Sequence, residues 1–247
     1  MTKGFGPLLP GFVHLTFGDL DGVTNAISDQ TAAIMIEPVQ GEGGIRPVPD
    51  AELKALRQIC DDNGLLLILD EVQCGMGRTG KLFAHEWAGI TPDIMMVAKG
   101  IGGGFPLGAV LASEEAASGM TAGTHGSTYG GNPLGCAVGC AVVEEIAAPE
   151  FLAEVGRKAG LLRQGLEALV AEHPEVFEEV RGAGLMLGLK CKAANTDVVS
   201  AGYDQALITV PAADNVIRLL PPLTLTDDEI STALQRLHQT AAQVEAA

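Results

Sequence analysis

Residues 65–70 read LLLILD, and this apolar run closed by an acid decides the expected fold. Parallel strands that are covered on both faces have such continuous apolar sequences. A helical pattern of apolar residues covers residues 49–62 and ends before Gly64, a residue type common at helix C-termini. Residues 32–37 (AAIMIE) form another apolar run ahead of that helix. The order strand, helix, strand predicts a layered α/β sheet.

The same alternation continues to about residue 148, where the character of the chain changes. Residues 94–98 and 108–113 are predicted as further strands of the first part. The later part is predicted to contain helices at residues 150–172, at 196–206 and from 227, and strands at residues 185–190, 207–210 and 216–219. We therefore expect a domain of residues 1–148 and a smaller α+β domain of residues 149–247.

The composition excludes several classes of function. The 247 residues include 15 Lys and Arg against 31 Asp and Glu, which gives a formal net charge of −16. Because phosphates repel such a field, the chain is not expected to bind nucleic acid or an anionic membrane surface. Hydrophobic residues make up 47% of the chain, which argues against disorder. No apolar run reaches the length of about 18 residues that predicts a membrane span, so we expect a cytoplasmic protein.

The cysteines also point to a reducing compartment. Five are present, an odd number without C-x-x-C spacing. Cys136 and Cys140 are one helical turn apart, but no further ligand is spaced to complete a metal site with them. We therefore expect no metal, and we expect both side chains to pack in the core.

Lys99 is the first candidate for chemistry. It is the only Lys or Arg between residues 82 and 156, and it follows directly on the predicted strand at residues 94–98. Open α/β sheets bind ligands at the carboxyl ends of their strands, and a lysine amine removed from water there acts as a nucleophile. Considered alone, this feature favours an ordinary lysine at the end of a strand.

Asp70 ends the run LLLILD and is expected at the same sheet edge as Lys99. A carboxylate and an isolated lysine at neighbouring strand ends meet the needs of pyridoxal phosphate (PLP) chemistry. The lysine forms the Schiff base, and the aspartate keeps the ring nitrogen protonated so that the ring takes up electrons. The alternative for Asp70 is a turn or helix-capping residue after the strand.

Residues 124–133 (THGSTYGGNP) are the third candidate. Small residues there leave backbone N–H groups accessible ahead of a helix predicted to begin near Asn132 and Pro133, which suits a phosphate; a plain surface loop is the alternative. Residues 75–80 match G-x-G-x-x-G, but neither a helix pattern nor an acid-ended strand follows at the spacing of a dinucleotide site. Residues 126–130 differ from a hydrolase elbow, because Thr replaces Ser and no strand precedes them.

Four motifs together resemble the class III (ornithine-type) aminotransferases. They are residues 37–44 (EPVQGEGG), 69–73 (LDEVQ) with 77–80 (GRTG), 92–100 (PDIMMVAKG) and 125–133 (HGSTYGGNP). Within that family, residues 80–109 are most similar to the acetylornithine branch. The resemblance implies a PLP-dependent transferase of fold type I, with a mostly parallel large-domain sheet and a small C-terminal domain. It also implies a homodimer in which both subunits contribute to each active site.

The resemblance further implies how the cofactor is bound. Lys99 would hold PLP as a Schiff base and move the proton between substrate carbon and cofactor. Asp70 would pair with the pyridine nitrogen, and Gln73 would hydrogen-bond the phenolic oxygen of the ring. Ser127 and Thr128 would bind phosphate, with Thr128 reaching the cofactor of the partner subunit.

The substrate residues implied by the resemblance are Arg218 and Glu42. Arg218 would bind the substrate α-carboxylate, a task suited to a guanidinium, although Arg218 alone is equally compatible with a surface ion pair. Glu42 would pair with Arg218 while the ω-amine substrate is bound. The implied reaction moves the δ-amino group of N2-acetylornithine to 2-oxoglutarate in arginine biosynthesis, giving N-acetylglutamate 5-semialdehyde and glutamate.

Several alternatives stay open at this point. The runner-up is another ω-amine transaminase, acting on ornithine, succinylornithine or 4-aminobutyrate. Family members carry a long segment ahead of the part equivalent to Gly4, which supplies the first strands, a phosphate-binding turn, an aromatic that stacks on the ring and a further arginine. We expect the N-terminal part to be absent from this chain, so a non-catalytic remnant is a second hypothesis, and a dinucleotide-binding oxidoreductase is a distant third.

Overall fold

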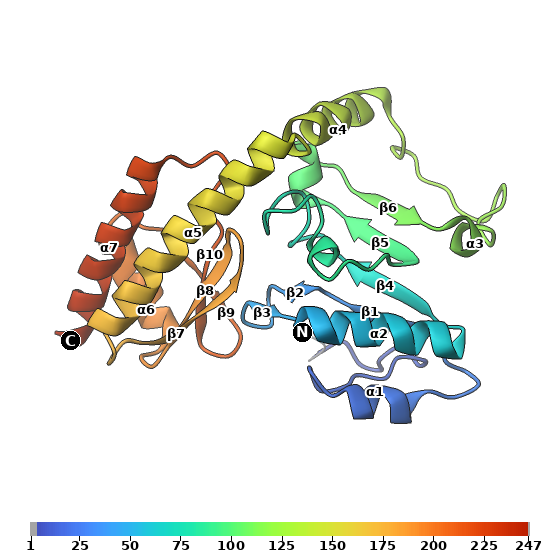
Figure 1. Ribbon diagram of the computed structural model, residues 1–247, viewed down its shortest axis with the longest axis horizontal. Coiled ribbons are helices and arrows are strands. Elements are labelled where there is room, and N and C mark those ends of the chain that lie inside the picture. The colour runs from blue at the N-terminus through green and yellow to red at the C-terminus, as the bar shows by residue number, and fades with distance from the viewer. Residues whose placement is uncertain (1–3, 247) are drawn as a thin grey trace.

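The computed structural model describes residues 4–246 and contains two main sheets joined by two consecutive helices (Figure 1). The first sheet has the order β1-β4-β5-β6, formed by β1 (Ala33–Ile36), β4 (Leu66–Asp70), β5 (Ile94–Val97) and β6 (Ala109–Ala112). The pairs β1–β4 and β4–β5 are parallel, and β6 is antiparallel to β5. The predicted layered α/β class is confirmed, with a mixed sheet.

Helix α2 (Asp50–Asn63) covers one face of this sheet, and α1 (Leu20–Ala26) packs beside it. Gly64 ends α2 in the left-handed conformation, with φ of 65°, as its position in the sequence predicts. Leu67 and Leu69 are fully buried in the cluster beneath α2. Leu66 is only half-buried, so the expectation that β4 is covered on both faces is wrong for the described residues. The second face has no comparable layer of apolar side chains packed on it within residues 4–246.

A short hairpin between β1 and α2 reaches from the first sheet to the second. It consists of β2 (Val39–Gln40) and β3 (Arg46–Pro47), strands too short for any sequence pattern to indicate. Ile45 at its tip is fully buried and belongs to a cluster with Met186 and Val216 of the second sheet. The hairpin tip is therefore anchored in the second sheet, which fixes the position of the residues just before it.

The second sheet is antiparallel throughout, with the order β7-β8-β10-β9. Its main core lies between the sheet and the helices, with Leu162, Leu166, Leu187, Leu189 and Leu237 among the buried side chains. The strands are β7 (Phe177–Ala183), β8 (Met186–Cys191), β9 (Val210–Ala212) and β10 (Val216–Leu219), and the helices are α5 (Pro149–Glu172), α6 (Asn195–Asp204) and α7 (Asp227–Glu245).

The second sheet differs from the sequence-based expectation at two strands. The strand expected at residues 207–210 begins only at Val210, because Leu207 N–H donates to Gly202 O at 2.8 Å and completes the turn that ends α6. Ala206 adopts a φ of 55° in that turn. Strand β7 was not predicted, because its sequence FEEVRGA carries charged residues where a buried strand would be apolar.

Helix α4 (Pro133–Ile146) and α5 follow each other across the junction between the two sheets (Figure 1). Asn132 caps α4 by accepting a hydrogen bond from Gly135 N at 2.7 Å, and Pro133 occupies the first turn, as predicted. Cys136 and Cys140 are exposed on α4, so their predicted core packing is wrong: the buried face of α4 is formed by Gly135, Gly139 and Ile146. The boundary at residue 148 lies between α4 and α5, and we keep it as a proposal.

The remaining elements are short: α3 (Glu114–Ala117) and the 3₁₀ turns η1 (Ala84–Trp87) and η2 (Lys99–Gly102). Within the part of the chain that the structure describes, no helix combines the length and apolar character needed to cross a lipid bilayer.

Candidate functional site

The candidate site lies at the carboxyl edge of the first sheet. Asp70 is the last residue of β4 and pairs in register with Met96 of β5, and Lys99 follows the end of β5. Both residues therefore lie at the same edge, where open α/β sheets bind ligands.

Lys99 has an unusual backbone. Its φ is 46°, a left-handed conformation that costs a non-glycine residue about 1–3 kcal/mol and that concentrates at functional sites. Lys99 opens the 3₁₀ turn η2, with Gly103 at its end in the same region at a φ of 53°. The lysine is exposed, so the removal from water that its position predicts is not provided by the described residues.

A second carboxylate, Glu37, lies close to Asp70 and Lys99. It follows β1, and one of its oxygens accepts a hydrogen bond from Gly41 N at 3.0 Å. Burial raises the pKa of Glu37, and the negative charge of Asp70 raises it further, while the Gly41 N–H and the positive charge of Lys99 lower it. No sequence pattern indicated Glu37 as a site residue, although it opens the motif EPVQGEGG.

Asp70 itself is half-buried and oriented by the backbone that follows it. Its Oδ1 accepts a hydrogen bond from Val72 N at 2.9 Å. This is the turn contact that the alternative interpretation of Asp70 expected. The same contact fixes the carboxylate at the sheet edge, so it is compatible with both interpretations.

Glu42, Gln73 and Arg218 are brought together from three distant parts of the chain. Arg218 Nη1 donates to Glu42 Oε1 at 2.5 Å and to Gln73 Oε1 at 3.4 Å. A side chain at Gly41 would lie within 2.2 Å of the Gln73 amide, so a glycine is required there for Gln73 to reach this position. The hairpin tip that is anchored by Ile45 thus places Glu42 against β10, where Arg218 lies.

The Arg218 guanidinium is 8% exposed and only partly satisfied. Among the described residues, its buried Nε has no hydrogen-bond partner. A buried donor without a partner is costly, and an oxygen ligand such as a carboxylate would remove that cost. Glu42, by contrast, is half-exposed, so the Glu42 carboxylate can leave the guanidinium and be solvated.

Ser127 and Thr128 are not brought to this edge by the described residues. Residues 121–130 are all exposed, and Ser127 Oγ accepts a hydrogen bond from Gly130 N at 3.0 Å within the loop itself. Within residues 4–246, no hydrogen bond or ion pair joins the side chains of Ser127 or Thr128 to Lys99, Asp70 or Arg218.

Two further residues hold the surroundings in place. The Glu71 carboxylate is 1% exposed and accepts hydrogen bonds from His85 N at 2.9 Å and from Ala84 N at 2.7 Å. Arg78 donates to Pro221 O at 2.5 Å and to Leu185 O at 3.3 Å, and these hydrogen bonds connect the first part of the chain to the second sheet. Burial lowers the pKa of Arg78 to about 10.

The dinucleotide-binding interpretation of residues 75–80 is wrong. These residues lead into the 3₁₀ turn η1, and no α-helix begins in the described chain between residues 64 and 113.

Comparison with known proteins identifies the family of the chain. Residues 1–241 match the family model of the class III aminotransferases. The chain is 69% identical over 245 residues to an acetylornithine aminotransferase of Rhodobacter capsulatus, covering 99% of this chain and 62% of that protein.

Solved structures show the same fold. The N-acetylornithine aminotransferase of Stenotrophomonas maltophilia K279a matches with a TM-score of 0.87 at 39% identity, over 96% of this chain and 63% of that one. An ornithine aminotransferase of Toxoplasma gondii, whose structure shows partial occupancy of PLP at its active site, matches with a TM-score of 0.93 at 32% identity, over 99% of this chain and 59% of that one.

The predicted fold-type-I architecture is confirmed by these structures. The chain spans about 60% of the length of the relatives that it matches, 62% for the first of them. Because the family model covers residues 1–241, the chain belongs to the class III aminotransferases.

Proposed function

We propose that the whole protein is an aminotransferase that moves the δ-amino group of N2-acetylornithine to 2-oxoglutarate with PLP as its cofactor. The observation that carries this proposal is the pairing of Arg218 with Glu42 and with Gln73, which follows Asp70 at the edge of the first sheet. Lys99 follows β5 at the same edge, and one buried nitrogen of Arg218 has no hydrogen-bond partner among the described residues. The similarity to acetylornithine aminotransferases supports the choice of substrate.

The residues present fit the chemical groups of PLP. The edge offers a carboxylate for the pyridine nitrogen, an amide for the phenolic oxygen and an amine for the aldehyde, supplied by Asp70, Gln73 and Lys99 respectively. When bound, PLP supplies an electron sink that stabilises negative charge on the carbon bearing the amine. Asp70 holds the proton on the pyridine nitrogen, and the Lys99 amine carries the proton to and from the substrate carbon.

Arg218 and Glu42 let one pocket accept two different substrates. While Glu42 pairs with Arg218, the guanidinium charge is neutralised. This suits N2-acetylornithine, whose δ-carbon carries the reacting amine but no carboxylate. When 2-oxoglutarate enters, Glu42 moves into solvent and Arg218 binds the α-carboxylate with two parallel hydrogen bonds. The exposure of Glu42 and the unpartnered Nε of Arg218 support this exchange.

The proposal includes a cytoplasmic homodimer with shared active sites. Helix α4 exposes Leu134 together with Cys136 and Cys140, an apolar face that solvent does not favour. The neighbouring loop with Ser127 and Thr128 is exposed as well, and this supports phosphate contacts made across a subunit interface. We also propose that the division at residue 148 separates the cofactor-binding part from the smaller part.

Absorbance spectroscopy and kinetics on the full-length protein test the proposal. The protein should bind PLP with a visible absorbance band that is lost in Lys99→Ala and retained in Lys54→Ala, a variant of an exposed lysine on α2. It should also show a higher kcat/KM for N2-acetylornithine than for ornithine, succinylornithine or 4-aminobutyrate. A band that persists without Lys99, or a full-length protein that binds no PLP, contradicts the proposal and favours the non-catalytic alternative.

A further inference from the structure

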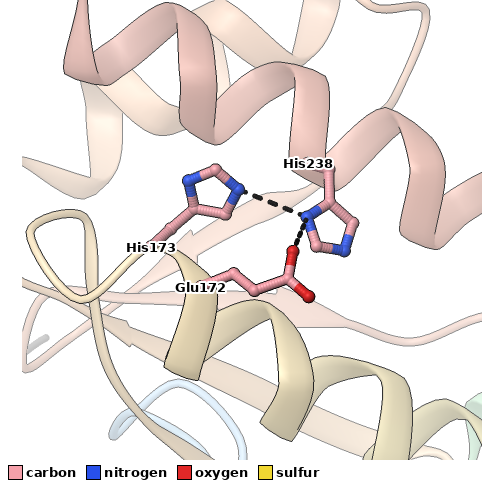
Figure 2. A group of neighbouring side chains, drawn as sticks. All are labelled: Glu172, His173 and His238. Carbon is pink, nitrogen blue, oxygen red and sulfur yellow. Dashed lines mark hydrogen bonds and ion pairs between the residues drawn. The ribbon is translucent and has the colours of Figure 1, made fainter.

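A cluster of two histidines and a glutamate lies outside the proposed active site. Glu172 and His173 are at the end of α5, and His238 is on α7, which lies beside α5 (Figure 2). One ligand atom from each residue lies within 4.8 Å of the others. We propose that these three side chains bind a zinc ion, which joins the end of α5 to α7.

Two of the three distances between the ligand atoms match a tetrahedral site. His173 Nε2 lies 3.2 Å from His238 Nδ1, and Glu172 Oε2 lies 3.4 Å from the same nitrogen. Zn²⁺ at about 2.0–2.1 Å from nitrogen and oxygen ligands in tetrahedral geometry separates neighbouring ligands by about 3.3–3.4 Å. These two pairs are already at the separation that the ion requires, and the third pair lies within 4.8 Å.

A fourth residue orients the first histidine. Glu245, the last residue of α7, places Oε1 3.1 Å from His173 Nδ1. A carboxylate only accepts hydrogen bonds, so it favours the proton on Nδ1 and leaves the Nε2 lone pair available to the ion. A carboxylate on the outer nitrogen of a histidine is the usual arrangement around protein-bound zinc.

The position on α5 also favours a cation. His173 is the C-terminal cap of this 24-residue helix, and the end of a helix carries partial negative charge from its unpaired carbonyl groups. Two imidazoles with one carboxylate favour Zn²⁺ over Mg²⁺ or Ca²⁺, which prefer oxygen ligands alone. The exposed Glu172 and the partly exposed His238 leave the fourth position open to water.

Zinc titration of the untagged full-length protein tests the site. The parent protein carries Cys136→Ser and Cys140→Ser, so that these two thiols, which are exposed in the described chain, cannot compete for the ion in any subunit that is not dimeric. We expect one Zn²⁺ per chain, with affinity measured against a chelator of known strength. Bound Zn²⁺ should also raise the thermal unfolding temperature, because an ion that binds only the folded chain stabilises it.

Single variants assign the ligands. Glu245→Gln should weaken affinity about 10–100-fold, as loss of an outer-shell partner does, and His173→Gln and His238→Gln should weaken it more. Glu172→Gln, at an exposed residue, gives a ligand variant with little risk to folding. His14→Gln, at an exposed histidine outside the cluster, should leave affinity and the temperature shift unchanged.

Co²⁺ in place of Zn²⁺ gives a readout of geometry. A tetrahedral site with two imidazoles should give intense visible bands that His238→Gln abolishes while circular dichroism shows an unchanged fold. The proposal is overturned if the parent protein takes up no Zn²⁺, or if the His173 and His238 variants bind it as tightly as the parent. In either case the histidine pair is only a hydrogen bond between α5 and α7.

Discussion

Lys99 and Arg218 show how single residues prepare the proposed site before any ligand arrives. Lys99 is held at a positive φ of 46°, and a residue keeps such a conformation only when its surroundings enforce it. Arg218 keeps one buried nitrogen without a partner among the described residues. Both features are costly in an unliganded chain and become useful when a ligand binds.

Replacement of Arg218 by lysine tests the exchange with Glu42. Because an ammonium cannot form two parallel hydrogen bonds to a carboxylate, and a hydrogen bond to a charged group contributes about 1.5–3 kcal/mol, kcat/KM for 2-oxoglutarate should fall about 10–100-fold in the full-length enzyme. The half-reaction with N2-acetylornithine should change much less. Single-turnover measurements of the two half-reactions separate these effects.

Arg181→Lys is the matched control for that experiment. Arg181 lies in β7, two strands from Arg218 in the sheet, and forms ion pairs with Glu179 and Asp214. Its replacement should leave both half-reactions unchanged. Equal losses in the two half-reactions of the Arg218 variant would contradict the exchange and indicate uniform loss of binding.

Asp93 links stability to pH. Burial raises the pKa of its carboxyl, but hydrogen bonds from Leu67 N and Arg57, each at 2.7 Å, outweigh burial and hold the pKa below its ordinary value of 3.8. A carboxyl with a lowered pKa in the folded state stabilises the protein above its ordinary pKa, and this contribution is lost as pH falls below that value. Acidification from neutral pH to about 3 should therefore remove part of the stability.

Urea unfolding of the 247-residue chain and of Asp93→Asn measures this contribution. The variant should be less stable than the parent by about 1–2 kcal/mol at neutral pH, since a neutral amide replaces a charged acceptor. The difference should shrink as pH approaches 3, because the parent then loses the same charge. A difference that stays constant with pH would show that Asp93 acts only through packing.

At the scale of elements, the hairpin β2–β3 determines where Glu42 lies. Its tip is fixed by Ile45 in the second sheet and by Ala213 N, which donates to Glu42 O at 3.0 Å. Gly44 has a φ of 106°, and a side chain there would lie 2.7 Å from Ala213 O. The hairpin therefore has little freedom to change without moving Glu42.

Gly44→Ala should destabilise the chain and disturb the pairing of Glu42 with Arg218. The backbone strain of a non-glycine residue at this φ adds about 1 kcal/mol or more, and the contact with Ala213 O adds to it. Gly64→Ala is the control, because Gly64 has a φ of 65° but open space around its Cβ position. Gly44→Ala should lower the unfolding free energy more than Gly64→Ala; equal effects would mean that the contact with Ala213 O is relieved freely.

At the scale of the whole molecule, the cysteines report which surfaces are covered. Burial raises the pKa of Cys60 and of Cys191 to about 11, and burial with the neighbouring Glu71 charge raises the pKa of Cys74 further. Thiolates are the reactive species, so these three should not react in the folded protein. Cys136 and Cys140 are exposed on α4.

Alkylation followed by mass spectrometry tests this distribution and the proposed dimer. In the 247-residue chain at about pH 8, Cys136 and Cys140 should be modified rapidly, and the other three only after denaturation. In the full-length homodimer, Cys136 and Cys140 should become protected if the apolar face of α4 is covered there. Rapid modification of both in the full-length protein would contradict the proposed cover over α4.

The sequence alone determined the parts of this protein that depend on local pattern. The strands at residues 65–70 and 94–98, the helix end at Gly64 and the cap of α4 at Asn132 all follow from periodicity and terminal residue types, which act over a few neighbouring positions. Asp70 and Lys99 lie at one edge for the same reason, because parallel strands end together.

Only the tertiary structure decided which distant residues meet. Glu42 and Arg218 are 176 residues apart, and they touch because Ile45 packs between β2 and the second sheet, a packing that no local pattern encodes. The same holds for His173 and His238, which share a cluster because α5 and α7 lie side by side on one sheet. Burial is likewise a property of the assembled core, which is why Cys136 and Cys140, apolar by residue type, are exposed on α4.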